Sequence, residues 1–208
     1  MSSHPKLTLY TAPQSRGFMV AWLLEELGVP YDAVVLDLSA GEHKAAWYLD
    51  IHPLGSVPAL AVQGRVILES LAICLWLADA YPAAGLAPSL NAPERAEFLQ
   101  WMVYATATIE PALSKPFVRS LGMPPAARRS TATSQERSQF DRVLAPLAGR
   151  FAEGFVASNR MTAADIVVSG ELYWAGQVGL MDRHSTAWSY LSRHRQRDAF
   201  ERAQRLTG

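Results

Sequence analysis

Apolar and polar residues near the start of the chain follow the periods of a strand, a helix and a second strand. "KLTLYT" (Lys6–Thr11) alternates with a period of two, as a strand does. After a turn signal at Pro13, "RGFMVAWLLEELG" predicts a helix that ends at Gly28. "YDAVVLDL" predicts a second strand, with the β-branched Val34 and Val35 in the core. This order predicts a right-handed β-α-β crossover with parallel strands.

The next segments predict the rest of a compact unit. "GEHKAAWYLDIHP" is read as a short helix or irregular segment, and "PALAV" and "RVIL" as a hairpin around Gln63-Gly64. "ESLAICLWLADAYP" is a strongly apolar helix that should stop at Pro82. We therefore expect a first domain over residues 1–82, with a mixed sheet and three helices in the order βαβ-α-ββα.

Strand signals disappear in the second half. Residues 83–92 are dense in Pro, Gly, Ser and Asn and are read as a linker. Residues 93–208 predict an all-helical domain, in which Pro111 and Pro116 bend or divide the first long helix. "MTAADI" predicts a capping box in the core helix, with Thr162 as N-cap and Asp165 as its N3 acid.

Composition and charge narrow the classes of protein. Half of the 208 residues are hydrophobic and 18% are charged, which is typical of a globular chain. Lys and Arg number 19, as do Asp and Glu, which argues against a nucleic-acid binder. The N-terminus shows no signal-peptide pattern and the apolar stretches are too short to span a bilayer, so we expect a cytoplasmic protein. The one cysteine, Cys74, excludes an intramolecular disulfide and a cysteine metal cluster, and we expect no metal.

Pro58 is the first residue with unusual chemistry, because it follows Val57 where a strand begins and removes a donor from the ladder. It fits an edge strand that begins with proline. It fits equally a cis turn that leaves the Val57 N–H and C=O facing outward, free to pair with an extended peptide.

Other polar residues have two readings each. Glu69 and Ser70 begin an apolar helix as capping residues, or hold a ligand's ammonium and carboxylate. Ser15 is an N-cap, or a donor to a bound thiolate at the positive end of the first helix. His43 and Lys44 are surface residues, or donors to a second carboxylate. Taken together these residues predict a site for a short acidic peptide with a thiol and a free amino-acid end, a description that fits glutathione.

With these motifs in place, the chain resembles the glutathione S-transferase family over essentially its whole length. "GEHKAAWYLDIHPLGSVPALAVQGRVILESLAI" is similar to the phi and theta classes. The resemblance implies a thioredoxin-like first domain, a cis Pro58, Val57 as the backbone clamp for the cysteinyl unit, and Glu69 with Ser70 at the γ-glutamyl end. It places His43 and Lys44 near the glycyl carboxylate. Ser56 stands where many relatives carry a longer side chain, which implies weaker glutathione binding.

The thiol-activating residue depends on how the first loop is aligned. Counting forward from the first strand gives Ser15, and counting backward from "LLEELG" gives Gln14. Ser15 is our choice, with Arg16 as a second donor. Three large aromatic residues of the helical half either line the second-substrate pocket or only pack between helices: Trp101, Tyr104 and Trp174.

The resemblance implies a cytosolic homodimeric enzyme of detoxification. It would stabilise the thiolate of its co-substrate glutathione and conjugate it to a small hydrophobic electrophile. A glutathione-dependent peroxidase on the same site and a non-catalytic scaffold for protein contacts are the alternatives. A disulfide oxidoreductase is disfavoured because the chain has no CxxC pair.

Overall fold

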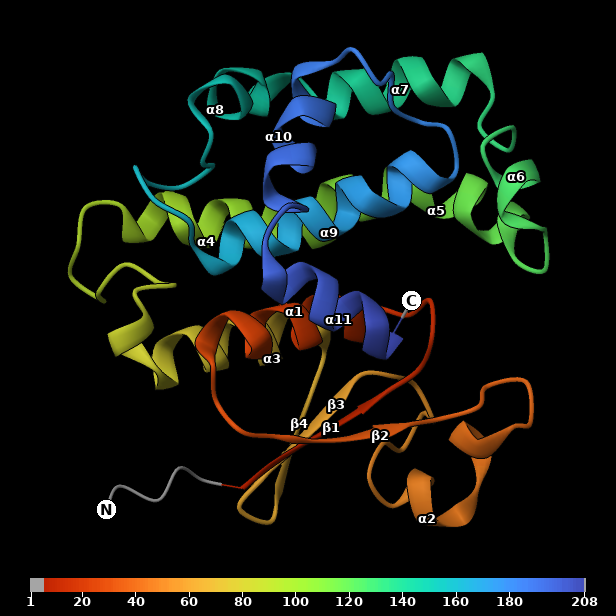
Figure 1. Ribbon diagram of the computed structural model, residues 1–208, viewed down its shortest axis with the longest axis vertical. Helices are drawn as coiled ribbons and strands as arrows, with labels where there is room; N and C mark the ends of the chain where they lie inside the picture. Colours follow the sequence, from red (N-terminus) through yellow and green to blue (C-terminus); the bar gives the residue numbers. More distant parts are fainter. Residues whose placement is uncertain (1–5, 208) are drawn as a thin grey trace. The chain divides into compact units, whose positions relative to one another are not determined.

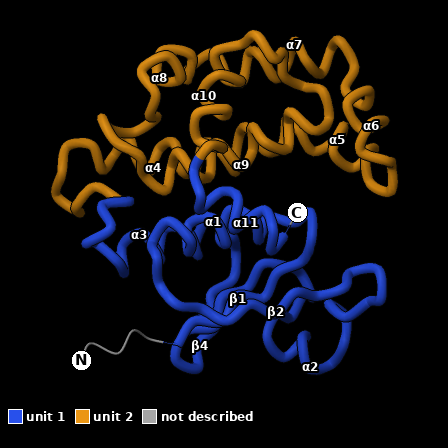
Figure 2. Tube along the Cα trace, viewed as in Figure 1, with its two compact units in different colours: residues 1–86, 197–208 blue, residues 87–196 orange. Residues whose placement is uncertain are grey.

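The computed structural model describes residues 6–207, which fall into two compact units (Figure 2). The first unit contains the chain up to Leu86 and the segment from Arg197 onward, and the second unit contains Ala87–Gln196. The sequence placed all of residues 93–208 in the helical domain, so the position of the terminal segment differs from that expectation. Its helix α11 (Asp198–Thr207) packs against α1 (Gly17–Leu27) through Phe200, whose ring lies 5.2 Å from that of Phe18.

The first unit is built on a four-stranded sheet of order β2-β1-β3-β4 (Figure 1). The strands are β1 (Leu7–Thr11), β2 (Asp32–Val35), β3 (Ala59–Val62) and β4 (Arg65–Leu68). β1 and β2 are parallel, as predicted, whereas β1–β3 and β3–β4 are antiparallel. Gln63 and Gly64 form the predicted hairpin turn with φ of 48° and 80°, the left-handed values that a two-residue type I′ loop requires.

The prediction that Val34 and Val35 lie in the core is wrong. β2 is an edge strand of the sheet, and the side chain of Val35 is 43% exposed. The core instead forms between β1, β3 and the helices, where Leu9, Leu60 and Trp22 are fully buried. Burial of a strand depends on which neighbours it pairs with, so its apolar composition alone was misleading.

Short helices complete the first unit. Helix α1 ends at Leu27, and Gly28 follows in the left-handed conformation with φ of 64°, as the sequence predicted. The 3₁₀ helix η1 (Glu42–Lys44) and helix α2 (Ala46–Leu49) follow β2, and α3 (Ser70–Ala80) follows β4. The 3₁₀ helix η2 (Pro82–Ala84) begins at the proline that was expected to stop α3.

The second unit is helical. It begins with α4 (Arg95–Tyr104), the π-helical segment η3 (Ala105–Ile109) and α5 (Glu110–Ser120). Pro111 is the second residue of α5, directly after the π-helical segment, and Pro116 lies inside α5. The long helix is therefore interrupted by a π turn before Pro111, and the chain stays helical past Pro116.

The remaining helices surround α9 (Ala163–Gln177), most of whose residues are buried. They are α6 (Pro125–Arg128), α7 (Ser134–Leu144), the 3₁₀ helix η4 (Ala145–Leu147), α8 (Ala148–Glu153) and α10 (Thr186–His194). The predicted pair of Thr162 and Asp165 is present: the carboxylate of Asp165 accepts from the backbone N–H of Thr162 at 2.7 Å and from its hydroxyl at 3.0 Å. The same carboxylate accepts from the Val156 N–H and the Tyr190 hydroxyl, both at 2.8 Å.

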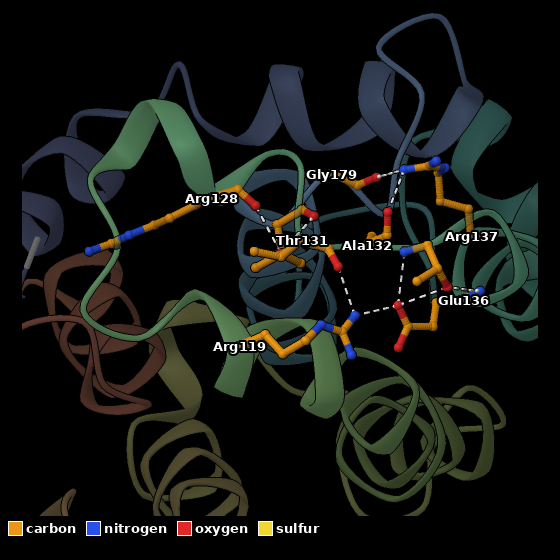
Figure 3. Close-up of polar contacts among 9 residues, drawn as sticks. Arg119, Arg128, Thr131, Ala132, Glu136, Arg137 and Gly179 are labelled. Atoms are coloured by element: carbon orange, nitrogen blue, oxygen red, sulfur yellow. Dashed lines mark hydrogen bonds and ion pairs between the residues drawn. The ribbon is translucent and has the colours of Figure 1, made fainter.

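A polar network joins the connection between α5 and α7 to the turn after α9 (Figure 3). Arg119 donates to the carbonyl of Thr131 at 2.7 Å and forms an ion pair with Glu136. Arg137 donates to the carbonyls of Ala132 at 2.8 Å and Gly179 at 3.4 Å. These bonds satisfy backbone carbonyls of a connection that has little regular structure of its own.

None of the helices within residues 6–207 is both long enough and apolar enough to cross a membrane.

Candidate functional site

The candidate residues of the first unit lie at one end of its sheet. Tyr10 in β1, Ala59 in β3 and Leu68 in β4 form one row of paired residues across the sheet. The loop with Ser15 follows β1, the Val57–Pro58 pair precedes β3, and Glu69 and Ser70 follow β4. All of them therefore leave the sheet at the same end.

The segment after β2 leaves the sheet at that end too, because Val35 pairs with Thr11, the last residue of β1. This segment carries His43 and Lys44 in η1 and runs into α2 (Figure 1). The strand register thus brings the segments that carry the sequence-predicted glutathione residues to the same end of the sheet.

Ser15 stabilises the loop that joins β1 to α1. Its hydroxyl donates to the carbonyl of Ala12 at 2.7 Å and accepts from the backbone N–H of Gly17 at 3.2 Å. The second bond satisfies one of the N–H groups that the start of a helix leaves unpaired. Because the hydroxyl proton points to Ala12, Ser15 must exchange this bond to donate to a ligand sulfur.

The neighbours of Ser15 give the loop a fixed shape. Gln14 has a φ of 54°, which non-glycine residues seldom adopt, and its backbone N–H donates to the carbonyl of Thr207 at 2.8 Å. A Cβ on Gly17 would lie 1.9 Å from Oγ1 of Thr11, so only glycine fits where the start of α1 crosses the end of β1. Thr11 is fully buried, and its hydroxyl has no hydrogen-bond partner among the described residues.

The Val57–Pro58 peptide bond is cis, as the resemblance implies. Val57 is half-buried and stands just before β3. Within the described residues, neither its N–H nor its carbonyl has a hydrogen-bond partner. A backbone donor and acceptor are thus available for an extended ligand, as in strand addition.

Lys44 ties η1 to the loop before Val57. Its ammonium donates to the carbonyls of Leu54 at 2.9 Å and Gly55 at 3.4 Å. Gly55 has a φ of 56°, and a Cβ there would lie 2.3 Å from the carbonyl oxygen of His43, so the two segments are in close contact. The Nδ1 atom of His43 is buried and has no hydrogen-bond partner among residues 6–207.

Sequence reasoning missed Tyr48 in this region. Its side chain is fully buried, and its hydroxyl donates to the carbonyl of Ser56 at 2.6 Å. Burial raises the pKa of Tyr48 to about 12, so the phenol keeps the proton that it donates. The sequence shows a tyrosine within a short predicted helix. The pattern of apolar positions treats such a tyrosine as a core aromatic residue and does not indicate that its hydroxyl has a hydrogen-bond partner.

Glu69 and Ser70 stand at the start of α3. Glu69 is the residue before the helix, is exposed, and makes no side-chain cap hydrogen bond. Its φ of 68° is unusual for a residue other than glycine. Neither side chain has a hydrogen-bond partner among residues 6–207, so neither forms the side-chain cap that was one of the two readings. A role of these two residues in binding a ligand stays a prediction.

A cavity of about 470 Å³ lies beside the β1–α1 loop and the end of β2. It is lined by Pro13 of the β1–α1 loop and by the end of β2 with the residues after it, which are Val35, Leu36, Asp37, Leu38 and Ser39. Hydrogen bonds from Ser39 and from the backbone of Ala40 and Ser39 lower the pKa of Asp37, which keeps one carboxylate at the rim of a mainly apolar wall.

The aromatic candidates of the second unit all have partners within that unit. The rings of Trp101 and Tyr104 meet edge to face at 5.4 Å, and the Tyr104 hydroxyl donates to the carbonyl of Val143 at 2.8 Å. Trp174 packs edge to face against Phe117 at 5.3 Å. These contacts are those of helix packing, and a role in substrate binding stays a prediction.

The remaining candidate chemistry concerns the single cysteine and metal binding. Burial raises the pKa of the Cys74 thiol to about 12, so this fully buried side chain stays a protonated thiol. No group of three or more His, Cys, Asp or Glu side chains placed to hold a metal occurs in the part of the chain that the structure describes.

Comparison with known families agrees with this arrangement. The model of the glutathione S-transferase N-terminal domain matches residues 5–79, and the model of the C-terminal domain of the same family matches residues 106–197. Glutathione S-transferase GST-4.5 of Xanthomonas campestris is 29% identical over 178 residues, which are 84% of this chain and 85% of that protein. Protein URE2 of Eremothecium gossypii is 34% identical over 125 residues, which are 55% of this chain and 35% of that protein.

A solved structure shows the same fold. The glutathione transferase URE2P6 from Phanerochaete chrysosporium, in complex with oxidised glutathione, superposes with a TM-score of 0.81 at 26% identity. The match covers 99% of this chain and 97% of that one. Two family models in the expected order, over most of the chain and with the matching fold, show that this protein belongs to the glutathione S-transferase family.

Proposed function

We propose that the protein binds glutathione at the end of its sheet, stabilises the thiolate, and joins it to a small hydrophobic electrophile. The observation that carries the proposal is the paired row of Tyr10, Ala59 and Leu68. It brings three of the loops that bear candidate residues to the same end of the sheet. Binding of glutathione by solved relatives, among them URE2P6 with oxidised glutathione, supports the choice of ligand.

Each part of glutathione has a matching group. The N–H and carbonyl of Val57 pair with the cysteinyl unit. Glu69 accepts from the γ-glutamyl ammonium, while Ser70 and the N–H groups at the start of α3 bind its carboxylate. His43 and Lys44 face the glycyl carboxylate, once Lys44 exchanges its bonds to the Leu54 and Gly55 carbonyls.

Ser15 is the group that stabilises the thiolate, with Arg16 as a second donor. When its hydroxyl turns from Ala12 to the sulfur, the helix α1 dipole and one charge-assisted hydrogen bond both favour the anion. Lowering a thiol pKa from about 8.5 to about 6.5 requires ~2.7 kcal/mol, which these two effects together can supply. The thiol proton passes to solvent, and the sulfur electron pair then forms the C–S bond to the electrophile. The leaving group, halide in the case of an aryl halide, departs with the electron pair of the bond that breaks.

The cavity near Pro13 is the proposed place for the apolar part of the electrophile. Its wall is formed mainly by Pro13, Val35, Leu36 and Leu38. Asp37 adds a negative charge at neutral pH, so neutral electrophiles are favoured over anionic ones.

Turnover with a neutral aryl halide and glutathione tests the proposal. We expect glutathione-dependent product formation that falls at least tenfold in the Glu69→Gln variant, because the ammonium loses its charged partner. Product formation that does not depend on glutathione would contradict the proposal.

A non-catalytic scaffold is the second candidate, favoured by the bond that commits the Ser15 hydroxyl to Ala12. Turnover of the aryl halide separates the two, because a scaffold can bind glutathione without forming product. The homodimer and the cytoplasmic location stay predictions of the resemblance.

A further inference from the structure

We propose that Tyr48 is a positioning residue for the glutathione clamp: its buried hydroxyl holds the Ser56–Val57 peptide group so that the Val57 N–H faces the ligand. This inference rests on the proposed glutathione site. It adds a residue that neither the sequence motifs nor the resemblance assigned.

The geometry of one peptide group carries the argument. The carbonyl that accepts from Tyr48 at 2.6 Å belongs to Ser56, and the N–H of the same peptide group belongs to Val57. A trans peptide is planar, and its C=O and N–H point in opposite directions. Fixing the carbonyl toward the interior therefore fixes the N–H toward the opposite side, where it has no partner among the described residues.

Tyr48 is itself held rigidly. The side chain is fully buried, its ring lies 5.8 Å from that of Tyr10 and 5.5 Å from that of Trp47, and it stacks on His52 at 6.4 Å. A buried phenol without a partner would be costly, so the bond to Ser56 fixes the ring and the loop together.

The hydrogen bond from Tyr48 to the Ser56 carbonyl also makes the Val57 N–H a stronger donor to the ligand. Hydrogen bonds in series polarise one another, so a carbonyl that accepts from Tyr48 makes the N–H of its own peptide group a stronger donor. The loop around this peptide is tied elsewhere as well, by the Gly55 N–H to the His52 carbonyl at 2.7 Å and by Lys44 to Leu54 at 2.9 Å. Tyr48 is the contact that acts directly on the Ser56–Val57 peptide.

The test is the Tyr48→Phe variant, which removes one oxygen atom and keeps the ring. Tyr31→Phe is the matched control, because Tyr31 also loses a hydroxyl bond in the first unit, the 2.8 Å bond to Glu25, at a place remote from the clamp in sequence. Calorimetry with glutathione and with S-methylglutathione measures affinity without depending on turnover or on the thiol.

We expect Tyr48→Phe to bind both ligands three- to tenfold more weakly, which is about the factor that one hydrogen bond contributes. Tyr31→Phe should bind both like the wild type. A loss confined to glutathione, or an equal loss in the two variants, would overturn the positioning role.

A second measurement needs no ligand. Amide hydrogen exchange of Val57, and its amide chemical shift in the nuclear magnetic resonance spectrum, report on this peptide in the free protein. We expect both to change in Tyr48→Phe and neither in Tyr31→Phe. If the wild type fails to bind glutathione, the proposed function fails, while an altered Val57 amide still supports the hold of Tyr48 on the peptide; an unaltered amide contradicts it.

Discussion

The backbone N–H of Gln14 donates to the carbonyl of Thr207 at 2.8 Å, so the last turn of α11 is bonded to the loop that carries Ser15. The two residues are far apart in sequence and belong to the same unit. Helix α11 is further joined to α1 by ion pairs of Arg197 with Glu26 and Arg202 with Glu25. The end of the described chain thus helps to build the frame on which the candidate thiol-activating loop rests.

The pair of Arg197 and Glu26 should stabilise this frame. Arg197 donates two bonds to Glu26, at 2.6 and 2.7 Å, and the carboxylate side chain is only 7% exposed. We expect Arg197→Ala to lower the free energy of unfolding by about 1 kcal/mol, because it leaves a mostly buried carboxylate with fewer donors. Urea denaturation measures the change.

Arg205→Ala is the control for that prediction. Arg205 pairs with Glu201 at 4.0 Å where both side chains are largely exposed, so its removal should leave stability unchanged. Equal losses of unfolding free energy in the two arginine variants would show that the pair with Glu26 stabilises the fold no more than an exposed ion pair does.

The carboxylate of Asp165 should matter more than its N-cap partner. Thr162→Ala should cost about 1 kcal/mol of stability, the usual loss of a cap. Asp165→Ala should cost at least ~3 kcal/mol, because the buried Val156 N–H and Tyr190 hydroxyl lose their acceptor as well. Thermal and urea unfolding of both variants give the order, and a reversed order would contradict the account of this network.

Acid should weaken the network of Figure 3 through Glu136. The bond from Arg119, with further bonds from Thr133, lowers the pKa of Glu136 to about 2 from 4.5. The unfolded chain therefore binds the proton first, and stability from this group is complete above pH 4.5 and is lost as the pH falls towards 2.

Melting temperatures measured between these pH values check the sign. Glu136→Gln should flatten the fall in melting temperature, since the glutamine does not titrate. Glu201→Gln, at an exposed position of α11, should leave the slope as in the wild type. A slope that Glu136→Gln does not change would remove Glu136 from the acid response.

Glu69 gives a test of binding that is separate from stability. Because Glu69 precedes α3 and makes no side-chain cap bond, Glu69→Gln should leave the melting temperature unchanged while weakening glutathione binding at least tenfold. Glu94→Gln is the matched control, since Glu94 precedes α4 in the same way and also makes no side-chain cap bond. Unchanged glutathione affinity in Glu69→Gln would exclude Glu69 from the site.

Local patterns predicted much of this fold. The β-α-β start, the hairpin at Gln63-Gly64 and the pair of Thr162 and Asp165 all depend on short-range rules, and the structure contains them. The resemblance also implied the cis bond before Pro58. These features need little knowledge of distant contacts.

Long-range contacts account for what the sequence did not predict. Val35 is exposed because β2 lies at the edge of the sheet, and strand order cannot be read from its own residues. The sequence placed the terminal segment in the helical domain, whereas its helix α11 packs against α1 in the first unit. Tyr48 was missed because its role depends on a carbonyl that lies close to it only once the loop has folded.

An absorbance titration of the thiolate of bound glutathione shows whether Ser15 activates the thiol. We expect a thiol pKa below the free value of about 8.5, and a return toward that value in Ser15→Ala. A lowered pKa that persists in Ser15→Ala would instead assign activation to Arg16 or to backbone donors. Bound glutathione with an unshifted thiol pKa would contradict thiolate activation by this protein.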